Sequence, residues 1–380
     1  MASSNRTFDL AVIGCGIVGA ACARAGTRAG LRTIIVEGSL AGGGATAAGM
    51  GHIVVMDGSE AQLALTLYSR RLWQQLIPEL PEAAEYRSCG TLWIAEHEAE
   101  LELARRKQAK LAGQGVACEI LDARQLMEAE PCLRPGLAGA LRVPDDGVLY
   151  PPIAAQWLWQ QAQNAGAVMR SGAIVTRIQE QAIHVAGGDR IQAGAIIVAA
   201  GSQGAELIPE IPLRPRKGHL LITDRYPGFL RHQVVELGYL QRAHAGTESS
   251  VSFNLQPRAT GQVLIGSSRQ YSHDRAVEPD VLSRMLARAQ SYVPRLGDLR
   301  GLRAWTGFRA ATPDDLPCIG PLPNRPHIFA ALGHEGLGIT TSLGTAELLL
   351  AQMLGAEAPI PAGPFQPARF FIETSPAGHA

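Results

Sequence analysis

A stretch of the first forty residues constrains the fold more than any other part of the chain. The apolar run Phe8–Ile13 leads into the glycine-rich segment Gly14–Gly19, small residues follow over Ala20–Ala25, and Thr33–Glu37 is a second apolar run. This order predicts a strand, a glycine turn, a helix and a second strand, which together make a βαβ unit. A G-x-G-x-x-G spacing at that point of a βαβ unit is typical of dinucleotide-binding folds.

Each glycine of this segment has a separate physical task. Gly14 permits the tight turn, Gly16 lets the backbone approach a pyrophosphate, and Gly19 lets the helix pack closely on the strand. The helix N-terminus supplies N–H donors and a partial positive charge. Glu37, at the end of the second strand, is placed to accept hydrogen bonds from an adenosine ribose.

Composition excludes several other classes of protein. The chain has 380 residues, of which 46% are hydrophobic, and 34 basic residues balance 34 acidic ones. Such a chain can bury a sizeable core, is long enough for about two domains, and lacks the charge surplus of a dedicated nucleic-acid binder.

The six cysteines contain no C-x-x-C pair and the histidines no H-x-H or H-x-x-x-H spacing, so we expect no metal site or iron–sulfur cluster held by this chain alone. Without a secretory-type leader or a long apolar span, the expected location is cytoplasmic.

Local patterns predict the elements that position these motifs. Expected helices are Ser59–Leu76, Glu98–Leu111, Gln156–Ala165, Val281–Tyr292 and Thr341–Leu354, and expected strands include Ala173–Ile178, Ile183–Val185, Ile196–Ala199, Val263–Gly266 and Ile328–Ala331. The pair Gly187-Gly188 predicts a hairpin turn.

A second glycine-rich turn, Gly333–Thr340, bears on the choice between a nicotinamide and a flavin. It follows a predicted strand and precedes a predicted helix, so it would bring a second helix N-terminus to the same ligand. A nicotinamide enzyme has little need of this turn. A flavin gains from it, because reduction places negative charge around N1 and O2 of the ring, which backbone N–H groups from Gly336 to Ile339 could stabilise.

These motifs together resemble the FAD-dependent D-amino-acid oxidase superfamily, in its glycine and sarcosine oxidase branch. The resemblance covers nearly the whole chain and rests on Gly14–Gly19 with Glu37, Gly44–Met50, Ile197–Gly201, Trp305–Asp314 with Pro317–Gly320, and Gly333–Thr340. The sequences of Gly49–Ile53 and Gly333–Gly338 are most similar to those of the catalytic flavoprotein subunit of D-hydroxyproline dehydrogenases. Glycine oxidase and the hydrogen cyanide synthase flavin subunit are relatives of that subunit.

The resemblance implies an α/β (α+β) fold in which a Rossmann-like FAD-binding domain, of the D-amino-acid oxidase and glutathione reductase type, carries an inserted antiparallel-sheet substrate domain. The FAD domain is expected from residues 1–85, 146–210 and 303–380, and the substrate domain from residues 86–145 and 211–302. Expected cofactor contacts are Gly14, Gly16, Ile17, Val18, Gly19, Glu37, Gly38, Gly44, Ala45, Thr46, Ala47, Ala48, Gly49, Met50, Val175, Ala199, Ala200, Gly201, Arg309, Gly333, Gly336, Leu337, Gly338, Ile339 and Thr340.

Arg309 matches the family arginine that grips the substrate carboxylate, a task suited to a planar and always charged guanidinium. His52 and Glu335 are candidates to tune protonation, and Tyr239, His244 and His52 are candidates to shape the pocket. The aromatic pocket position of the family aligns poorly near Phe253 and Asn254. The Trp305–Arg309 stretch lacks the cysteine that bonds flavin in sarcosine oxidase relatives, and Cys318 stands in a later turn, so FAD is expected to bind non-covalently.

The resemblance implies oxidation of a small D-amino or secondary amino acid, of the D-proline or cis-4-hydroxy-D-proline type, to its imine. Glycine or sarcosine oxidase activity, a hydrogen cyanide synthase-like flavin subunit and a 2-hydroxy-acid dehydrogenase stay open. So do two other classes, a nicotinamide-dependent dehydrogenase and a flavin-bearing electron-relay or assembly subunit. Expected partners are a carboxylate-bearing amine substrate and either iron–sulfur subunits of a hetero-oligomer or a respiratory-chain acceptor, which would allow a peripheral position at the inner face of the cell membrane.

Overall fold

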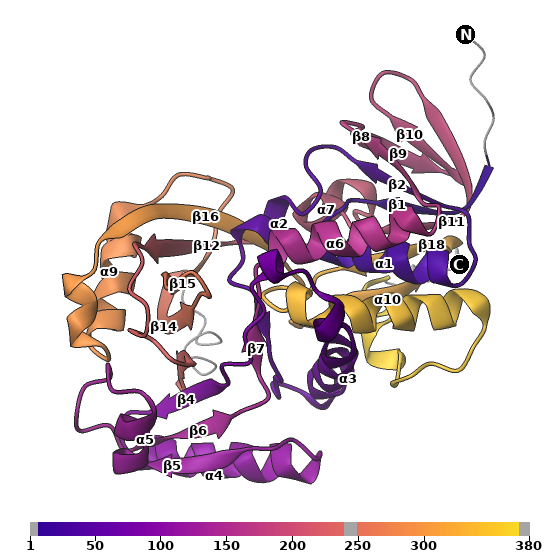
Figure 1. The fold of residues 1–380 in the computed structure, drawn as a ribbon. Helices are drawn as coiled ribbons and strands as arrows, with labels where there is room; N and C mark the ends of the chain where they lie inside the picture. The colour runs from indigo at the N-terminus through magenta and orange to yellow at the C-terminus, as the bar shows by residue number, and fades with distance from the viewer. Residues whose placement is uncertain (1–6, 239–248, 372–380) are drawn as a thin grey trace, which may run out of the picture.

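The computed structural model describes residues 7–238 and 249–371, and two eight-stranded sheets organise this part of the chain (Figure 1). The first sheet runs in the order β17-β18-β11-β1-β2-β8, and β10 and β9 continue from β11. Its strands are β1 (Thr7–Ile13), β2 (Thr33–Glu37), β8 (Val168–Ser171), β9 (Val175–Gln179), β10 (Ala182–Val185), β11 (Arg190–Val198), β17 (Cys318–Leu322) and β18 (Arg325–Leu332).

The centre of the first sheet is parallel, from β18 through β11, β1 and β2 to β8. Its strands are apolar on both faces because both faces are covered, and Leu10, Ala11 and Val12 have no exposed surface. Four helices build the core on one face: α1 (Ile17–Arg28), α3 (Glu60–Leu76), α6 (Pro151–Asn164) and α10 (Gly338–Leu354).

The second sheet follows the order β16-β12-β15-β14-β13-β4-β6-β5. Its strands are β4 (Thr91–Ala95), β5 (Glu119–Asp122), β6 (Gly139–Val143), β12 (Arg214–Thr223), β13 (Gln233–Glu236), β14 (Ser249–Pro257), β15 (Val263–Tyr271) and β16 (Gly301–Ala311). Helices α4 (Glu98–Gly113), α5 (Ala123–Ala129) and α9 (Pro279–Gln290) pack against it.

The second sheet differs from the expectation in two respects. It is not wholly antiparallel, because β13 and β4 pair in parallel. Strands β8 to β11 of the first sheet lie between β4 and β13 in the sequence. No hairpin therefore connects β4 to β13, and the two strands are not constrained to run antiparallel. In addition, β16 pairs with β12 from Gly301 to Ala311, so a domain boundary at residue 303 would cut a continuous strand.

Several element limits also differ from their predicted positions. Helix α6 begins at Pro151, five residues before the predicted start, because proline at the first helical position has no N–H to satisfy. Strand β11 begins at Arg190, since its polar first half pairs with β10 across the predicted glycine hairpin. Helix α10 begins at Gly338, three residues earlier than its apolar pattern indicated.

The two sheets meet where the short helix α2 (Gly44–Ala48) lies against β16. Trp305 Nε1 donates a hydrogen bond to the Ala48 carbonyl at 3.3 Å, and a Cβ atom on Gly307 would lie 2.4 Å from the Ala48 Cβ. Strand β3 (His52–Ile53) follows α2 in the chain and pairs with the distant β7 (Gly147–Val148) in a two-stranded sheet. Among the described residues, no helix combines the length and apolar character that crossing a bilayer requires.

Candidate functional site

The Gly14–Gly19 turn joins β1 to α1 and leaves no room for side chains at two of its glycines. Gly14 has a φ of +97°, and a Cβ atom there would lie 2.7 Å from the Ala199 carbonyl oxygen. A Cβ atom on Gly19 would lie 1.9 Å from the Gly14 carbonyl oxygen. At Gly16, by contrast, a Cβ atom would meet no backbone atom and only the side-chain oxygen Thr46 Oγ1, at 3.2 Å. Gly16 therefore leaves the start of α1 open to a ligand.

Glu37 ends β2 beside this turn, and the backbone holds its carboxylate in place. Oε2 accepts a hydrogen bond from the Cys15 N–H at 2.6 Å, and Oε1 accepts one from the Ser39 N–H at 2.7 Å. Oε1 also accepts from the Ser39 hydroxyl at 3.2 Å, whereas Oε2 keeps a further acceptor lone pair. The carboxylate is therefore held in place with one acceptor position left, and its contact with an adenosine ribose stays a prediction.

The three glycine-rich segments, 14–19, 42–51 and 333–340, lie together although they are far apart in the sequence. The Gly42 N–H donates to the Cys15 carbonyl at 2.7 Å, and the Ile17 N–H donates to Thr46 Oγ1 at 3.0 Å. A Cβ atom on Gly49 would lie 3.0 Å from Ile339 Cδ1. A single ligand can therefore touch all three segments.

Helices α1 and α10 both begin at this junction without a side-chain cap and without an acidic residue in their first turn. Their N-terminal N–H groups and partial positive charges suit an anionic ligand. The start of α10 is held firmly, since Thr340 Oγ1 donates to the His52 carbonyl at 2.8 Å and Trp73 Nε1 donates to the Ile339 carbonyl at 3.2 Å.

The remaining predicted cofactor residues surround the same junction. Ala199, Ala200 and Gly201 follow β11 beside Gly14, and no atom lies within 4 Å of the position that a Cβ on Gly201 would take. Val175 begins β9, whose preceding residue Ile174 lies against Gly38. The other predicted residues belong to the segments already described: Val18, Gly44, Ala45, Ala47, Met50, Gly333, Gly336, Leu337 and Gly338.

Arg309 projects from β16 beside β12, where it pairs with Arg216 across the strands. A Cβ atom on Gly218 would lie 2.8 Å from Arg309 Nη1, so the glycine makes room for the guanidinium. Nη1 donates to the Ser268 carbonyl at 3.1 Å, and Nε lies 3.9 Å from Glu335 Oε1. Nη2, which also lies against Gly218, makes no hydrogen bond to the residues that the structure describes, so its N–H groups can donate to a ligand.

His52 lies in β3 close enough to Arg309 to be affected by its charge. Burial, with a smaller contribution from Arg309, lowers the pKa of His52 to about 4. Its Nε2 atom is buried and has no hydrogen-bond partner in the described part of the chain. The imidazole is therefore neutral near pH 7 and has a ring nitrogen to offer to a bound molecule.

Glu335 lies in the glycine-rich turn before α10 and does not have the properties of a group that exchanges protons near neutral pH. Burial would raise its pKa, but the charges of Arg269, Arg309 and Arg216 outweigh burial and lower it to about 2. The carboxylate stays ionised, so Glu335 would influence protonation through its fixed charge, and its part in tuning protonation stays a prediction.

The structure limits the candidates for the pocket wall. Tyr239 and His244 lie outside the described residues. Phe253 is buried against α9, where its ring stacks on Tyr292 with centroids 4.6 Å apart. The next residue, Asn254, points to the other face of the sheet and pairs with Gly266, which lies against Met50.

Three residues of this site were missed by sequence reasoning: Gly218, Gly266 and Ser268. Gly218 and Gly266 leave space for Arg309 and Met50, and Ser268 acts through a backbone carbonyl. No local motif marks such residues, since their roles depend on strand pairing.

The residues present fit FAD. Two uncapped helix N-termini converge, Gly201 borders open space, and Glu37 is held at the end of β2. The buried Nε2 of His52, which has no hydrogen-bond partner among residues 7–238 and 249–371, adds a polar atom that a ligand can contact. Cys318 is fully buried in β17, and burial raises the pKa of its thiol to about 11, so a reactive thiolate is not available there.

Comparison with known proteins identifies the family. Residues 9–353 match the model of the DAO family, described as FAD dependent oxidoreductase. The chain belongs to this family. Together with the FAD-type fold and the site described above, this makes the protein an FAD-dependent oxidoreductase, and it confirms the predicted fold class and cofactor.

Individual members of the family align over most of their length. Glycine oxidase from Geobacillus kaustophilus is 28% identical over 91% of this chain and 93% of its own. Its crystal structure superposes with a TM-score of 0.85 at 27% identity, covering 95% of this chain and 98% of the other. Hydrogen cyanide synthase subunit HcnC from Pseudomonas aeruginosa is 26% identical over 96% and 97% of the two chains, and an opine oxidase subunit from Rhizobium meliloti is 25% identical over 88% and 90%.

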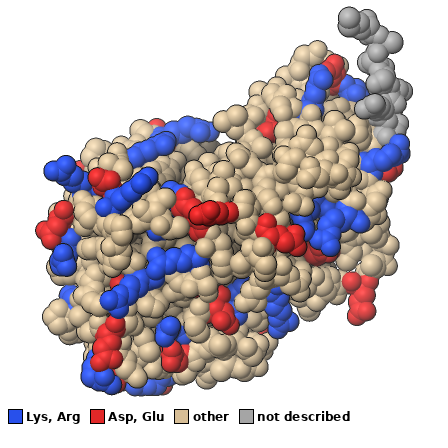
Figure 2. All heavy atoms as spheres, viewed as in Figure 1, with Lys and Arg blue, Asp and Glu red and all other residues tan. Residues whose placement is uncertain are grey.

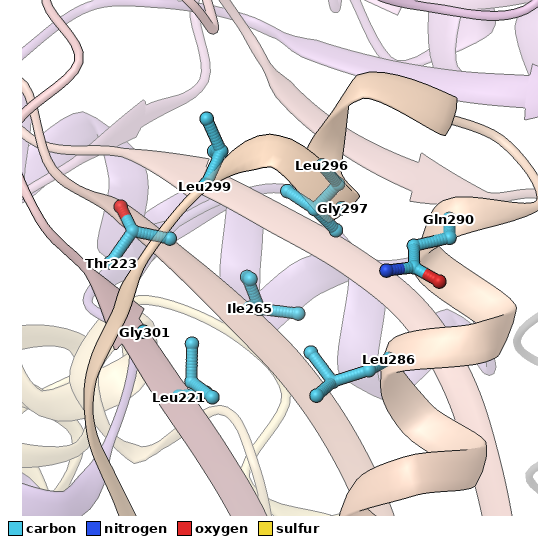
Figure 3. A pocket seen from close by; sticks show the side chains of 9 residues that line it. All are labelled: Leu221, Thr223, Ile265, Leu286, Gln290, Leu296, Gly297, Leu299 and Gly301. Carbon is cyan, nitrogen blue, oxygen red and sulfur yellow. The ribbon is translucent and has the colours of Figure 1, made fainter.

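A separate small cavity of about 100 Å³ lies between the second sheet and α9 (Figure 3). Its lining includes Leu221, Ile265 and Leu286, and it contains no titratable side chain. Charges of both signs are interspersed on the face of the molecule shown in Figure 2. Neither feature competes with the Arg309 site as a place for chemistry.

Proposed function

We propose that this FAD-dependent oxidoreductase oxidises a small D-amino or secondary amino acid, of the D-proline or cis-4-hydroxy-D-proline type, to its imine. The observation that carries the proposal is the open Nη2 edge of Arg309 next to the turn that begins α10. A guanidinium in this position recognises a carboxylate. When bound, FAD supplies the acceptor for the hydride that leaves the substrate Cα.

Arg309 would fix the substrate by its carboxylate, and orientation of this kind accounts for much of the rate of such reactions. The packing of Gly218 and the Ser268 carbonyl hold the guanidinium while it does so. His52 stays neutral, because burial and the charge of Arg309 make it too weak a base to take the proton of the substrate ammonium, and its Nε2 would instead accept a hydrogen bond from the substrate amine.

The relatives support an amine or amino-acid substrate. The names of glycine oxidase from Geobacillus kaustophilus and of the opine oxidase subunit from Rhizobium meliloti refer to such substrates, and both proteins align over most of this chain. The narrower choice of a cyclic D-amino acid rests on the resemblance of Gly49–Ile53 and Gly333–Gly338 to D-hydroxyproline dehydrogenases.

An anaerobic panel tests the substrate class. The purified flavoprotein is mixed with D-proline, cis-4-hydroxy-D-proline, glycine, sarcosine and D-alanine, and loss of the flavin absorbance is followed. We expect the two cyclic substrates to bleach the flavin fastest. Faster bleaching by glycine or sarcosine would favour the oxidase alternative, and no bleaching by any of them would favour an electron-relay subunit.

We further propose that electrons leave through a partner and that the chain acts as part of a hetero-oligomer, in the cytoplasm or at the inner face of the membrane. Two relatives, HcnC and the opine oxidase chain, are named as subunits. Copurification from the native host with iron and additional polypeptides would support an iron–sulfur partner. A lone chain that forms hydrogen peroxide stoichiometrically with substrate would count against it.

A further inference from the structure

A carboxylate of the protein itself stands next to the arginine that would bind the substrate. Glu335 Oε1 lies 3.9 Å from Arg309 Nε and 3.4 Å from Arg216 Nη1, and Oε2 lies 3.6 Å from Arg269 Nη2. All four side chains are at most 20% exposed. Solvent therefore screens this cluster weakly, and each charge affects its neighbours strongly.

The backbone around Glu335 holds the carboxylate in this position. The residue has a φ of +48°, in the left-handed region that side chains other than those of asparagine and aspartate seldom adopt. Its N–H donates to the Ala310 carbonyl at 2.9 Å, next to Arg309 on β16, and its carboxylate also accepts from the Gly336 N–H. A non-glycine residue kept in this conformation is commonly a functional one.

Glu335 is the one carboxylate within 4.0 Å of the Arg309 guanidinium nitrogens among the residues that the structure describes. Arg216 has a second carboxylate, Asp315, at 3.2 Å, and its Nη2 donates to the Tyr271 hydroxyl at 2.6 Å. Among the described residues, the negative charge nearest the Arg309 guanidinium is thus that of Glu335.

We propose that Glu335 is a specificity-determining residue that restricts the Arg309 site to substrates with a single carboxylate. A substrate monocarboxylate needs only the Nη2 edge that the protein leaves open. A second carboxylate placed toward Arg216 or Arg269 would meet an anion already in that place, and like charges in a weakly screened site repel. This inference rests on the proposed function, because it takes Arg309 as the carboxylate-binding residue.

Binding of carboxylates that cannot be oxidised tests the inference without turnover. Propionate and malonate form a matched pair, since malonate replaces the methyl group of propionate by a second carboxylate. Dissociation constants are measured from perturbation of the flavin absorbance and, independently, from the shift in melting temperature. The wild-type protein should bind propionate more tightly than malonate.

The variant Glu335→Gln keeps the shape of the side chain and removes its charge. We expect the ratio of the malonate to the propionate dissociation constant to fall by about tenfold or more. Asp315→Asn is the matched control, because it removes the same charge from a more exposed partner of Arg216 and leaves the neighbour of Arg309 unchanged. Asparagine also tolerates the φ of +56° at this position. The ratio should change little in this control.

Three outcomes overturn the proposal. One is equally tight binding of malonate and propionate by the wild type, which can be measured even if Glu335→Gln does not fold. The second is an equal fold-loss of affinity for malonate and propionate in Glu335→Gln, which indicates that Glu335 only supports the arginines. The third is an equal change of the ratio in Asp315→Asn. Unaltered propionate binding in Arg309→Met would instead contradict the proposed function.

Discussion

The Nη1 atom of Arg309 donates a hydrogen bond to the backbone carbonyl of Ser268 at 3.1 Å. The Ser268 hydroxyl oxygen accepts from the His219 N–H at 3.0 Å and lies 2.8 Å from His219 Nδ1. His219 Nε2 in turn accepts from the Glu278 N–H at 3.0 Å, so Nδ1 carries the ring proton and donates it to Ser268. The Arg309 guanidinium is thus anchored to a chain of hydrogen bonds that runs through the buried Ser268 and His219 and ends at the start of α9.

Removing the Ser268 hydroxyl should loosen this anchor. In Ser268→Ala the buried His219 donors lose their acceptor, which costs about 1–3 kcal/mol of unfolding free energy. The Michaelis constant should rise severalfold while kcat changes less, because Arg309 still binds but is held less firmly. Denaturant unfolding and steady-state kinetics measure the two effects. Ser252→Ala, at another buried serine of the same sheet, is the control, and an equal rise of the Michaelis constant there would contradict the role of Ser268.

Replacement of Arg309 should affect substrate binding far more than cofactor binding. Arg309→Met removes the proposed carboxylate partner, and loss of such an interaction costs about 2–5 kcal/mol, which corresponds to about 30-fold to several thousandfold in the Michaelis constant. The absorbance spectrum of the bound flavin should persist. Arg303→Met, on an exposed residue of the same strand, serves as the control. A Michaelis constant that stays the same in Arg309→Met would refute the assignment.

Two glycines of the first turn should respond differently to alanine. In Gly19→Ala the new Cβ would lie 1.9 Å from a backbone oxygen, so we expect the protein to fold poorly. In Gly16→Ala the nearest atom is Thr46 Oγ1 at 3.2 Å and φ is −67°, so the apoprotein should fold with a loss of about 1 kcal/mol or less. The FAD dissociation constant should nevertheless rise about tenfold or more, because the methyl group enters the space where α1 begins. Apoprotein melting and fluorescence titration with FAD separate the two effects, and tight FAD binding by Gly16→Ala would argue against a pyrophosphate at this turn.

Acid should destabilise the protein through the half-buried His334. Burial lowers the pKa of His334 to about 4, whereas an exposed histidine titrates near 6.5. The unfolded chain therefore binds more protons between these values, and the free energy of unfolding falls as the pH decreases from about 6.5 to about 4. We expect this residue to contribute a loss of about 2 kcal/mol, discounted for its partial exposure. His334→Gln should reduce the pH dependence measured by denaturant unfolding at pH 5 and pH 7.5, whereas His273→Gln, on an exposed residue, should leave it unchanged.

Local sequence was sufficient for the first βαβ unit and for the helices with clear periodicity. Ile17 and Glu37 could be placed because the strand, turn and helix are consecutive, and α3 begins within one residue of its predicted start. The limits of β11 and α6 were missed because a polar strand end and a proline at the first helical turn carry no apolar pattern.

The candidate site was predictable only in the parts that a motif specifies. Arg309 and the glycine segments could be found, but the surroundings of Arg309 depend on how β12, β15 and β16 pair. Glu335 illustrates the difference. Its position in the sequence suggested a residue near the site, and only the three arginines assembled from separate strands explain why its carboxylate stays charged.

The order of strands in the first sheet has a consequence for synthesis of the chain. Strand β11 pairs with β1 on one side and with β18 on the other, although β18 ends at Leu332. Until the ribosome has made that strand, one edge of the parallel sheet stays uncovered and α10 is absent from its face. A nascent chain can therefore form the first glycine turn early but cannot complete the enclosure of the flavin until more than three hundred residues have emerged. We expect translation stalled before this point to yield a product that neither retains FAD nor resists proteolysis.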